Sequence, residues 1–168
     1  MIKFSKKNYL FKFYTWLPII ILFISVFNEF DFNYLNIEYF SFNFPFILIF
    51  YFALKEYNHF DTFLVFLAGL INDTVVGLPL GLSSLSYILI CIFATYLRNI
   101  TIRPHLIKDW FYFLFTISLI NSINYSILFI FFSYELDITF YLINNLFTFL
   151  FYVLFTVIFN RYLKGVDE

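Results

Sequence analysis

The chain has 168 residues and a formal net charge of −1; 62% of the residues are hydrophobic, 12% are charged, and the mean hydropathy is +0.87. Because soluble domains carry about 25% charged residues, this composition excludes an ordinary soluble protein. The absence of a basic excess also argues against a nucleic-acid-binding surface. We therefore expect residues 1–168 to form a single transmembrane domain, an all-α integral membrane protein.

Six apolar segments, separated by charged or turn-rich stretches, predict a six-helix transmembrane bundle. The expected spans lie near 13–28, 40–54, 60–76, 82–97, 110–132 and 138–159. The second segment is short, since residues 42–54 would give a helix of about 20 Å. It would need Tyr39, Phe40 and Ser41, or a locally thinner bilayer, to cross.

The charges predict how the bundle is oriented. If the N-terminus is cytoplasmic, all ten basic residues fall on the cytoplasmic side of six spans. The external segments then carry only the acids Glu29, Asp31, Glu38, Glu135 and Asp137. By the positive-inside rule, we expect a multi-pass protein with both termini cytoplasmic. No small-residue cleavage site follows the first apolar run, so that run is interpreted as a retained anchor.

Residues 69–81 interrupt the apolar background with three of the four glycines and one of the four prolines. Pro79 removes a backbone donor and favours extended geometry at Leu78, so a tight turn from Gly77 to Gly81 is expected rather than a small-residue helix-packing motif. Asp73 precedes this turn. An acid at that depth either ends the helix locally, organises the turn or faces a partner, and these roles are compatible.

Polar residues elsewhere form three groups. Asn72 neighbours Asp73, and Ser83, Ser84 and Ser86 give the fourth span a small polar start suited to capping or close packing. Two stripes at helical spacing follow in the fifth and sixth spans. They comprise Ser118, Asn121 or Ser122, and Tyr125, then Asn145, Thr148, Tyr152 and Thr156. These stripes indicate either hydrogen bonds between helices or a cavity for a solute.

The remaining candidates indicate no chemistry. His59 and His105 lie in predicted loops without metal-ligand spacing, and Cys91 is interpreted as a small hydrophobe. Trp16 and Trp110 are expected to anchor span ends at the interface. No nucleophile and base pattern or nucleotide-binding motif occurs, so we expect neither an enzyme nor a cofactor. An enzyme acting on lipid would need clustered ionisable groups at depth, for which Asp73 alone is thin support.

Residues 66–98 contain a Gly-Leu at Gly69, then Asp73, then the turn Gly77-x-Pro79-Leu-Gly81, then Arg98 one helix later. This pattern resembles the MreD family of bacterial rod shape-determining membrane proteins. The resemblance implies six helices in the bacterial inner (cytoplasmic) membrane, in a fold similar to the substrate-binding component of energy-coupling-factor transporters. It carries Gly69, Asp73, Gly77, Pro79, Gly81 and Arg98 over as residues of a partner contact or of a structural turn.

The function implied by the resemblance is a non-enzymatic scaffold of the elongasome. Such a scaffold binds MreC, accompanies RodA, a class B penicillin-binding protein and MreB among the membrane lipids, and helps to direct peptidoglycan synthesis and to maintain rod shape. The alternative is a small-solute binding or transport component with the same six-helix fold. That alternative predicts a polar cavity, which the stripes on the fifth and sixth spans could line.

Overall fold

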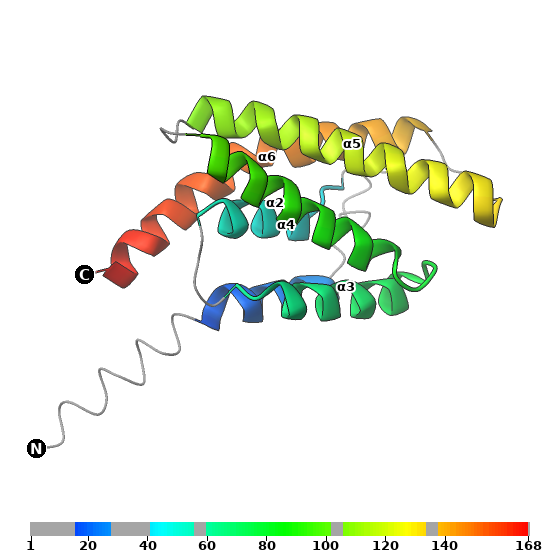
Figure 1. The fold of residues 1–168 in the computed structure, drawn as a ribbon, viewed down its shortest axis with the longest axis horizontal. Coiled ribbons are helices and arrows are strands. Elements are labelled where there is room, and N and C mark those ends of the chain that lie inside the picture. Colours follow the sequence, from blue (N-terminus) through cyan, green and yellow to red (C-terminus); the bar gives the residue numbers. More distant parts are fainter. Residues whose placement is uncertain (1–15, 28–40, 56–59, 102–105, 134–137, 168) are drawn as a thin grey trace, which may run out of the picture.

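The computed structural model describes residues 16–27, 41–55, 60–101, 106–133 and 138–167, and Figure 1 shows them as packed helices. The predicted all-α class is confirmed for these residues. The helices are a first helix Trp16–Phe27, α2 Phe44–Leu54, α3 Thr62–Val76, α4 Leu82–Ile100, α5 Leu106–Phe132 and α6 Ile138–Asp167. Each of the six predicted apolar segments therefore overlaps one helix. The expected similarity to the transporter component stays a prediction.

Three helices are long and apolar enough to cross a membrane, as a membrane protein requires. They are Leu82–Ile100, with 19 residues, Leu106–Phe132, with 27, and Ile138–Leu163, with 26. A span needs about 20 residues, because each residue of a helix advances 1.5 Å across roughly 30 Å of hydrocarbon. The first helix, α2 and α3 are apolar but shorter. Half of the six predicted spans therefore reach full membrane length within the described residues.

The ends of α5 and α6 differ from the predicted boundaries for a physical reason. Helix α5 begins at Leu106 instead of 110, and α6 continues to Asp167 instead of ending at 159. Hydropathy marks where apolar residues give way to charged ones, such as Lys108 and Arg161. The backbone N–H and C=O groups of a helix form hydrogen bonds within the helix, so the helix can continue past the boundary between apolar and charged residues. The structure therefore extends both helices beyond their apolar segments.

Helix α2 forms the centre of the core. Nine consecutive residues from Phe44 to Phe52 are buried, which is typical of a helix enclosed by other helices. Its 11 residues advance only about 16 Å, so as a helix it is shorter than the predicted span 40–54. The helix begins late because Asn43 Oδ1 caps the Phe46 N–H at 3.3 Å and Pro45 occupies its first turn.

Aromatic rings fill the space around α2. Phe50 lies 5.1 Å from the ring of Phe113 on α5 and 5.8 Å from that of Tyr152 on α6, between ring centroids. Phe46 meets Tyr87 of α4 edge to face at 5.9 Å. These distances and angles are those that aromatic pairs prefer. The short helix is thus held by rings from three neighbouring helices.

Helices α5 and α6 lie side by side on one face of the bundle (Figure 1). Trp110 of α5 stacks on Phe149 of α6 at 4.4 Å, with 6° between the ring planes, and its indole N–H donates to the Phe149 carbonyl at 2.8 Å. Trp110 therefore makes a helix contact besides the interface role that we expected for it. Large apolar side chains such as Ile130 and Phe131 are exposed on α5, as suits contact with lipid.

Candidate functional site

Asp73 caps a helix other than its own. Its carboxylate is fully buried; Oδ2 accepts the backbone N–H of Gly81 at 2.7 Å and Oδ1 accepts that of Ser83 at 2.8 Å. Gly81 is the N-cap residue of α4 and has no side chain to satisfy the free N–H groups of that helix start. The negative charge also lies at the positive end of the α4 dipole. Asp73 thus supplies from α3 the cap that α4 lacks.

The predicted turn between α3 and α4 is confirmed. Gly77 and Gly81 have φ angles of 75° and 99°, in the left-handed region that glycine adopts without strain. Gly77 ends α3, and the N–H groups of both Gly77 and Leu78 bond to the Asp73 carbonyl. The bond from Leu78 is the six-residue closure of a Schellman motif. The Pro79 carbonyl then accepts the Leu82 N–H at 3.2 Å, at the first residue of α4.

Gly69 permits a close approach of α3 and α4. A Cβ placed on Gly69 would lie 2.5 Å from the Ser84 Cα and 2.7 Å from the Ser84 N. No side-chain rotation relieves a contact with main-chain atoms, so any larger residue would push the helices apart. Gly77 and Gly81 have open space around them instead. The close packing therefore rests on Gly69, and the Gly77/Gly81 pair serves the turn.

The serines at the start of α4 join this helix to its neighbours. Ser83 Oγ accepts from the Asn72 side-chain amide at 2.9 Å, and Ser84 Oγ donates to the Phe66 carbonyl of α3 at 3.2 Å. Ser86 bonds to Asn124 of α5 at 2.8 to 2.9 Å. Capping of α4 comes from Asp73. The serines provide the close packing that their small size predicted.

Arg98 lies at the other end of α4, apart from the turn. It is 15 residues beyond Ser83, which is about 22 Å along the helix axis. Its guanidinium donates a long bond of 3.4 Å to the carbonyl of Ala53, in the last turn of α2. The positive charge thus meets the carbonyl end of a helix, where the dipole favours it. The two charged residues of the MreD-like pattern each contact the end of another helix.

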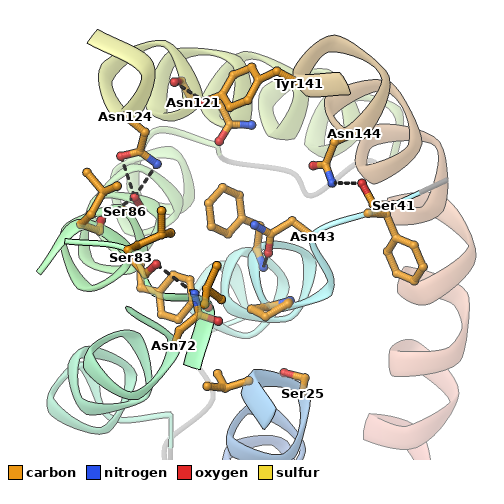
Figure 2. Close-up of a pocket in the computed structure, with 18 of the residues that line it drawn as sticks. Ser25, Ser41, Asn43, Asn72, Ser83, Ser86, Asn121, Asn124, Tyr141 and Asn144 are labelled. Carbon is orange, nitrogen blue, oxygen red and sulfur yellow. Dashed lines mark hydrogen bonds between the residues drawn. The ribbon is translucent and has the colours of Figure 1, made fainter. Parts of the chain in front are cut away.

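A cavity of about 450 Å³ lies inside the bundle next to this unit. Figure 2 shows polar side chains from every surrounding helix turned toward it. Its polar lining comprises Ser25, Ser41, Asn43, Asn72, Ser83, Ser86, Tyr87, Asn121, Asn124, Tyr141 and Asn144. Its apolar lining includes Phe46 and Leu82. Such a volume is typical of small-molecule sites, which lie between about 300 and 1,000 Å³.

All lining residues come from one end of the bundle. They lie in the C-terminal halves of the first helix, α3 and α5, and at the beginnings of α2, α4 and α6. The basic residues Lys55, Arg98, Lys108 and Arg161 occupy the opposite helix ends. In Figure 1 the turn between α3 and α4 and the end of α5 mark the cavity end, at the right. The lining residues that the structure describes include no acid or base.

The two predicted polar stripes mostly join helices. Asn121 Nδ2 donates to Asn145 Oδ1 at 2.7 Å, and Thr148 Oγ1 accepts the backbone N–H of Asn43 at 2.9 Å. Ser122 and Thr156 bond within their own helices, to Ser118 and Tyr152. Of both stripes, only Asn121 lines the cavity.

Sequence reasoning missed most of the cavity and one buried acid. Asn43 precedes a helix, where an amide ordinarily indicates capping, and Asn124 and Asn144 lie within apolar helices, where an amide ordinarily indicates a contact between helices. Asp109, in the first turn of α5, is only 5% exposed; an acid just before an apolar run was the available signal.

The cysteine and the two histidines considered in the sequence analysis are not assigned to a functional site. Cys91 is buried, while His59 and His105 lie outside the described residues. Within the described ranges, no group of three His, Cys, Asp or Glu side chains could hold a metal ion.

Comparison with protein-family models, with curated proteins and with solved structures gave no match. The resemblance of residues 66–98 to the MreD pattern therefore rests on those residues alone.

Proposed function

We propose that the chain is a non-enzymatic scaffold of the cell-elongation machinery, with both termini cytoplasmic in the bacterial inner membrane. It binds MreC and, with RodA, a class B penicillin-binding protein and MreB, helps to direct peptidoglycan synthesis. The observation that carries this proposal is the cross-capped unit of α3, the turn and α4. Four residues of the MreD-like pattern, Gly69, Asp73, Gly77 and Gly81, each have a specific backbone task in it.

The unit supports a scaffold because it fixes two helices and presents an apolar tip. Both oxygens of the Asp73 carboxylate accept backbone N–H groups, which favours a structural role over acid–base chemistry. Leu80, in the turn, is 72% exposed. This side chain is therefore available for contact with a protein partner at this end of the bundle.

Copurification tests the proposal. The chain should recover full-length MreC, with its membrane anchor, better than the soluble domain of MreC alone, because its own surface is predominantly apolar. A tagged, unrelated six-span protein of similar hydropathy provides the background. Equal recovery of the two forms of MreC would contradict an interaction within the membrane. If neither form of MreC is recovered above the background, the proposed scaffold function is wrong.

The alternative function, a small-solute component, is favoured by one observation, the polar cavity. The cavity contains amides and hydroxyls from all its neighbouring helices. A transport role would also require an energising partner, which copurification of an ATPase pair instead of MreC would reveal. A scaffold can hold a ligand as well, so the cavity is compatible with both functions.

A further inference from the structure

The cavity contains polar groups whose hydrogen-bonding capacity is unused. Asn43 accepts a bond through Oδ1, but its side-chain NH₂ has no partner among the described residues. The same holds for the Oδ1 atoms of Asn72 and Asn121, which bond only through their NH₂ groups. Tyr87 is 1% exposed and its hydroxyl makes no hydrogen bond within the described ranges. Tyr87 and Asn121 are buried, and Asn43 and Asn72 are half-buried. Because buried polar groups are ordinarily paired, the unused atoms of Tyr87 and Asn121 in particular indicate a missing partner.

We propose that this cavity binds an uncharged polyhydroxyl group, the ring of a neutral sugar. The unused groups are of both kinds, since an amide NH₂ donates, an amide oxygen accepts and a phenol does either. A sugar hydroxyl also donates and accepts, so it can satisfy each of them. This assignment does not depend on the scaffold role.

The charge of the described lining disfavours an ionic ligand. None of the lining residues that the structure describes is an acid or a base, and Asp73 nearby already has both oxygens engaged. An ion in this cavity would be removed from water without a counter-charge, at a cost of several kcal/mol. A neutral ligand avoids this cost because neutral hydrogen bonds replace those it made to water.

The distribution of polar groups favours a sugar over a flat heterocycle. In Figure 2 the labelled amides and hydroxyls surround the cavity, with Asn72 and Ser83 facing Asn121 and Tyr141, and Ser41 and Asn144 on another side. A ring with hydroxyls around its whole edge can reach them all, whereas a heterocycle has apolar edges. The rings of Phe46 and Tyr87, edge to face at 5.9 Å, also line the cavity and offer apolar contact.

The position of the cavity indicates two sources for such a sugar. The lining residues lie at the helix ends opposite the basic residues, which the positive-inside rule places outside the cell. The sugar is therefore either free outside the membrane or the headgroup of a glycolipid in the outer leaflet. Both present the same uncharged ring.

The experiment uses the full chain, purified in lauryldimethylamine oxide so that no sugar-headed detergent occupies the cavity. After transfer to phosphatidylcholine nanodiscs, thermal unfolding is followed while glucose or N-acetylglucosamine is titrated, or with monoglucosyl diacylglycerol in the disc. We expect a saturable rise of the midpoint with at least one neutral sugar. A response to the glycolipid alone identifies a headgroup; a response to the free sugars identifies a solute. Inorganic phosphate, phosphatidylglycerol and nicotinamide should have no effect.

Two tyrosine variants separate binding from stability. Tyr87→Phe removes a hydroxyl without a partner, so the empty protein should unfold at an unchanged or higher temperature while the sugar binds about two- to tenfold more weakly. Tyr51→Phe is the matched control, because its hydroxyl donates to Asn160 Oδ1 at 2.7 Å and Tyr51 does not line the cavity. It should lower the midpoint and leave sugar binding unchanged.

Three results would overturn the proposal. One is the absence of any response to the free sugars and to the glycolipid at millimolar concentration. Another is an equal or larger response to phosphate, phosphatidylglycerol or nicotinamide, which would assign the cavity to an anion or a heterocycle. The third is full sugar affinity in Tyr87→Phe. Copurification of MreC is measured separately, so failure of the scaffold role and failure of sugar binding are distinguishable.

Discussion

The carboxylate of Asp73 accepts the backbone N–H of Ser83 at 2.8 Å, so the end of α3 caps the start of α4. Ten residues separate the two, and the turn from Gly77 to Gly81 returns the chain so that they meet. Arg98 makes the complementary contact, from α4 to the last turn of α2. Negative charge thus lies at a helix start and positive charge at a helix end, as the helix dipole favours. Both contacts tie α4 to its neighbours.

Asp73→Asn should destabilise the protein. An asparagine retains one oxygen for the Gly81 and Ser83 N–H groups and turns its own NH₂ toward the other donor. We expect a loss of about 1.5 to 3 kcal/mol, the value of one hydrogen bond to a charged group, measured by unfolding in mixed micelles. If the protein has the proposed function, complementation of rod shape should fall with it.

Asp61→Asn is the matched control for Asp73→Asn. Asp61 caps its own helix α3 by accepting the Phe63 N–H at 3.1 Å, and it is exposed. Asparagine and aspartate are nearly equivalent at such a position, so stability should change little. Equal stability of both variants would contradict the cross-helix cap. Membrane abundance must be measured beside cell shape, because about 1 kcal/mol of destabilisation can change abundance several-fold.

Gly69→Ala should separate α3 from α4. The added Cβ would lie 2.5 Å from the Ser84 Cα, closer than real Cβ contacts occur. We expect a loss of about 1 to 3 kcal/mol, typical of overpacking, in the same unfolding assay. In a double variant, adding Ser84→Gly to Gly69→Ala should fail to restore stability, because the obstructing atoms belong to the main chain of Ser84. Restored stability in the double variant would show that the contact is with the side chain instead.

Gly77→Ala tests conformation alone, because nothing lies within 4 Å of a Cβ at Gly77. Its φ of 75° still costs an alanine about 1 kcal/mol. Asparagine tolerates this region better and valine worse, so stability should fall in the order Gly77, Asn, Ala, Val. A neutral valine variant would show that the turn does not require the left-handed conformation.

Local chemistry was readable from the sequence where residues act on their own neighbours. Pro79 between Gly77 and Gly81 predicted the turn, and the apolar runs predicted six helices. The sequence indicated that the second segment is short, but it did not indicate that α2 is buried, because an uncharged apolar segment fits a buried helix and a lipid-exposed span equally well. In the structure, nine consecutive residues of α2 are buried and the helix packs against α4 and α6.

The sequence did not predict contacts between segments that are distant in the chain. Asp73 could be placed at a helix end, but its partner Ser83 depends on how sharply the chain reverses. The cavity depends on packing even more, since Asn43, Asn124 and Asn144 come from three helices. Each amide alone looks like a cap or a helix contact. Only their convergence makes them a site.

The orientation of the chain is predicted with both termini cytoplasmic. All ten basic residues lie on one side of a six-span arrangement, and the positive-inside rule places that side in the cytoplasm. Reporter fusions at Lys55, Arg103 and Glu168 should therefore be cytoplasmic, and those at Asn36 and Glu135 external. Because α2 is short, the fusion at Lys55 is the most informative one. An external reporter there would show that residues 40–54 do not cross.

The apolar turn tip is predicted to contact MreC. Leu80→Ser should reduce recovery of full-length MreC by roughly ten- to a hundredfold, because burial of a leucine at an interface contributes about 1.5 to 3 kcal/mol. Leu80 is 72% exposed in the free chain, so the unfolding midpoint should stay unchanged. Ile130→Ser on α5 is the control, since Ile130 is similarly exposed, at 69%, on a helix face suited to lipid. Loss of MreC with Ile130→Ser and not with Leu80→Ser would move the contact to α5. Unchanged recovery in both variants would remove the turn as a partner surface and leave α3 and α4 with a purely structural motif.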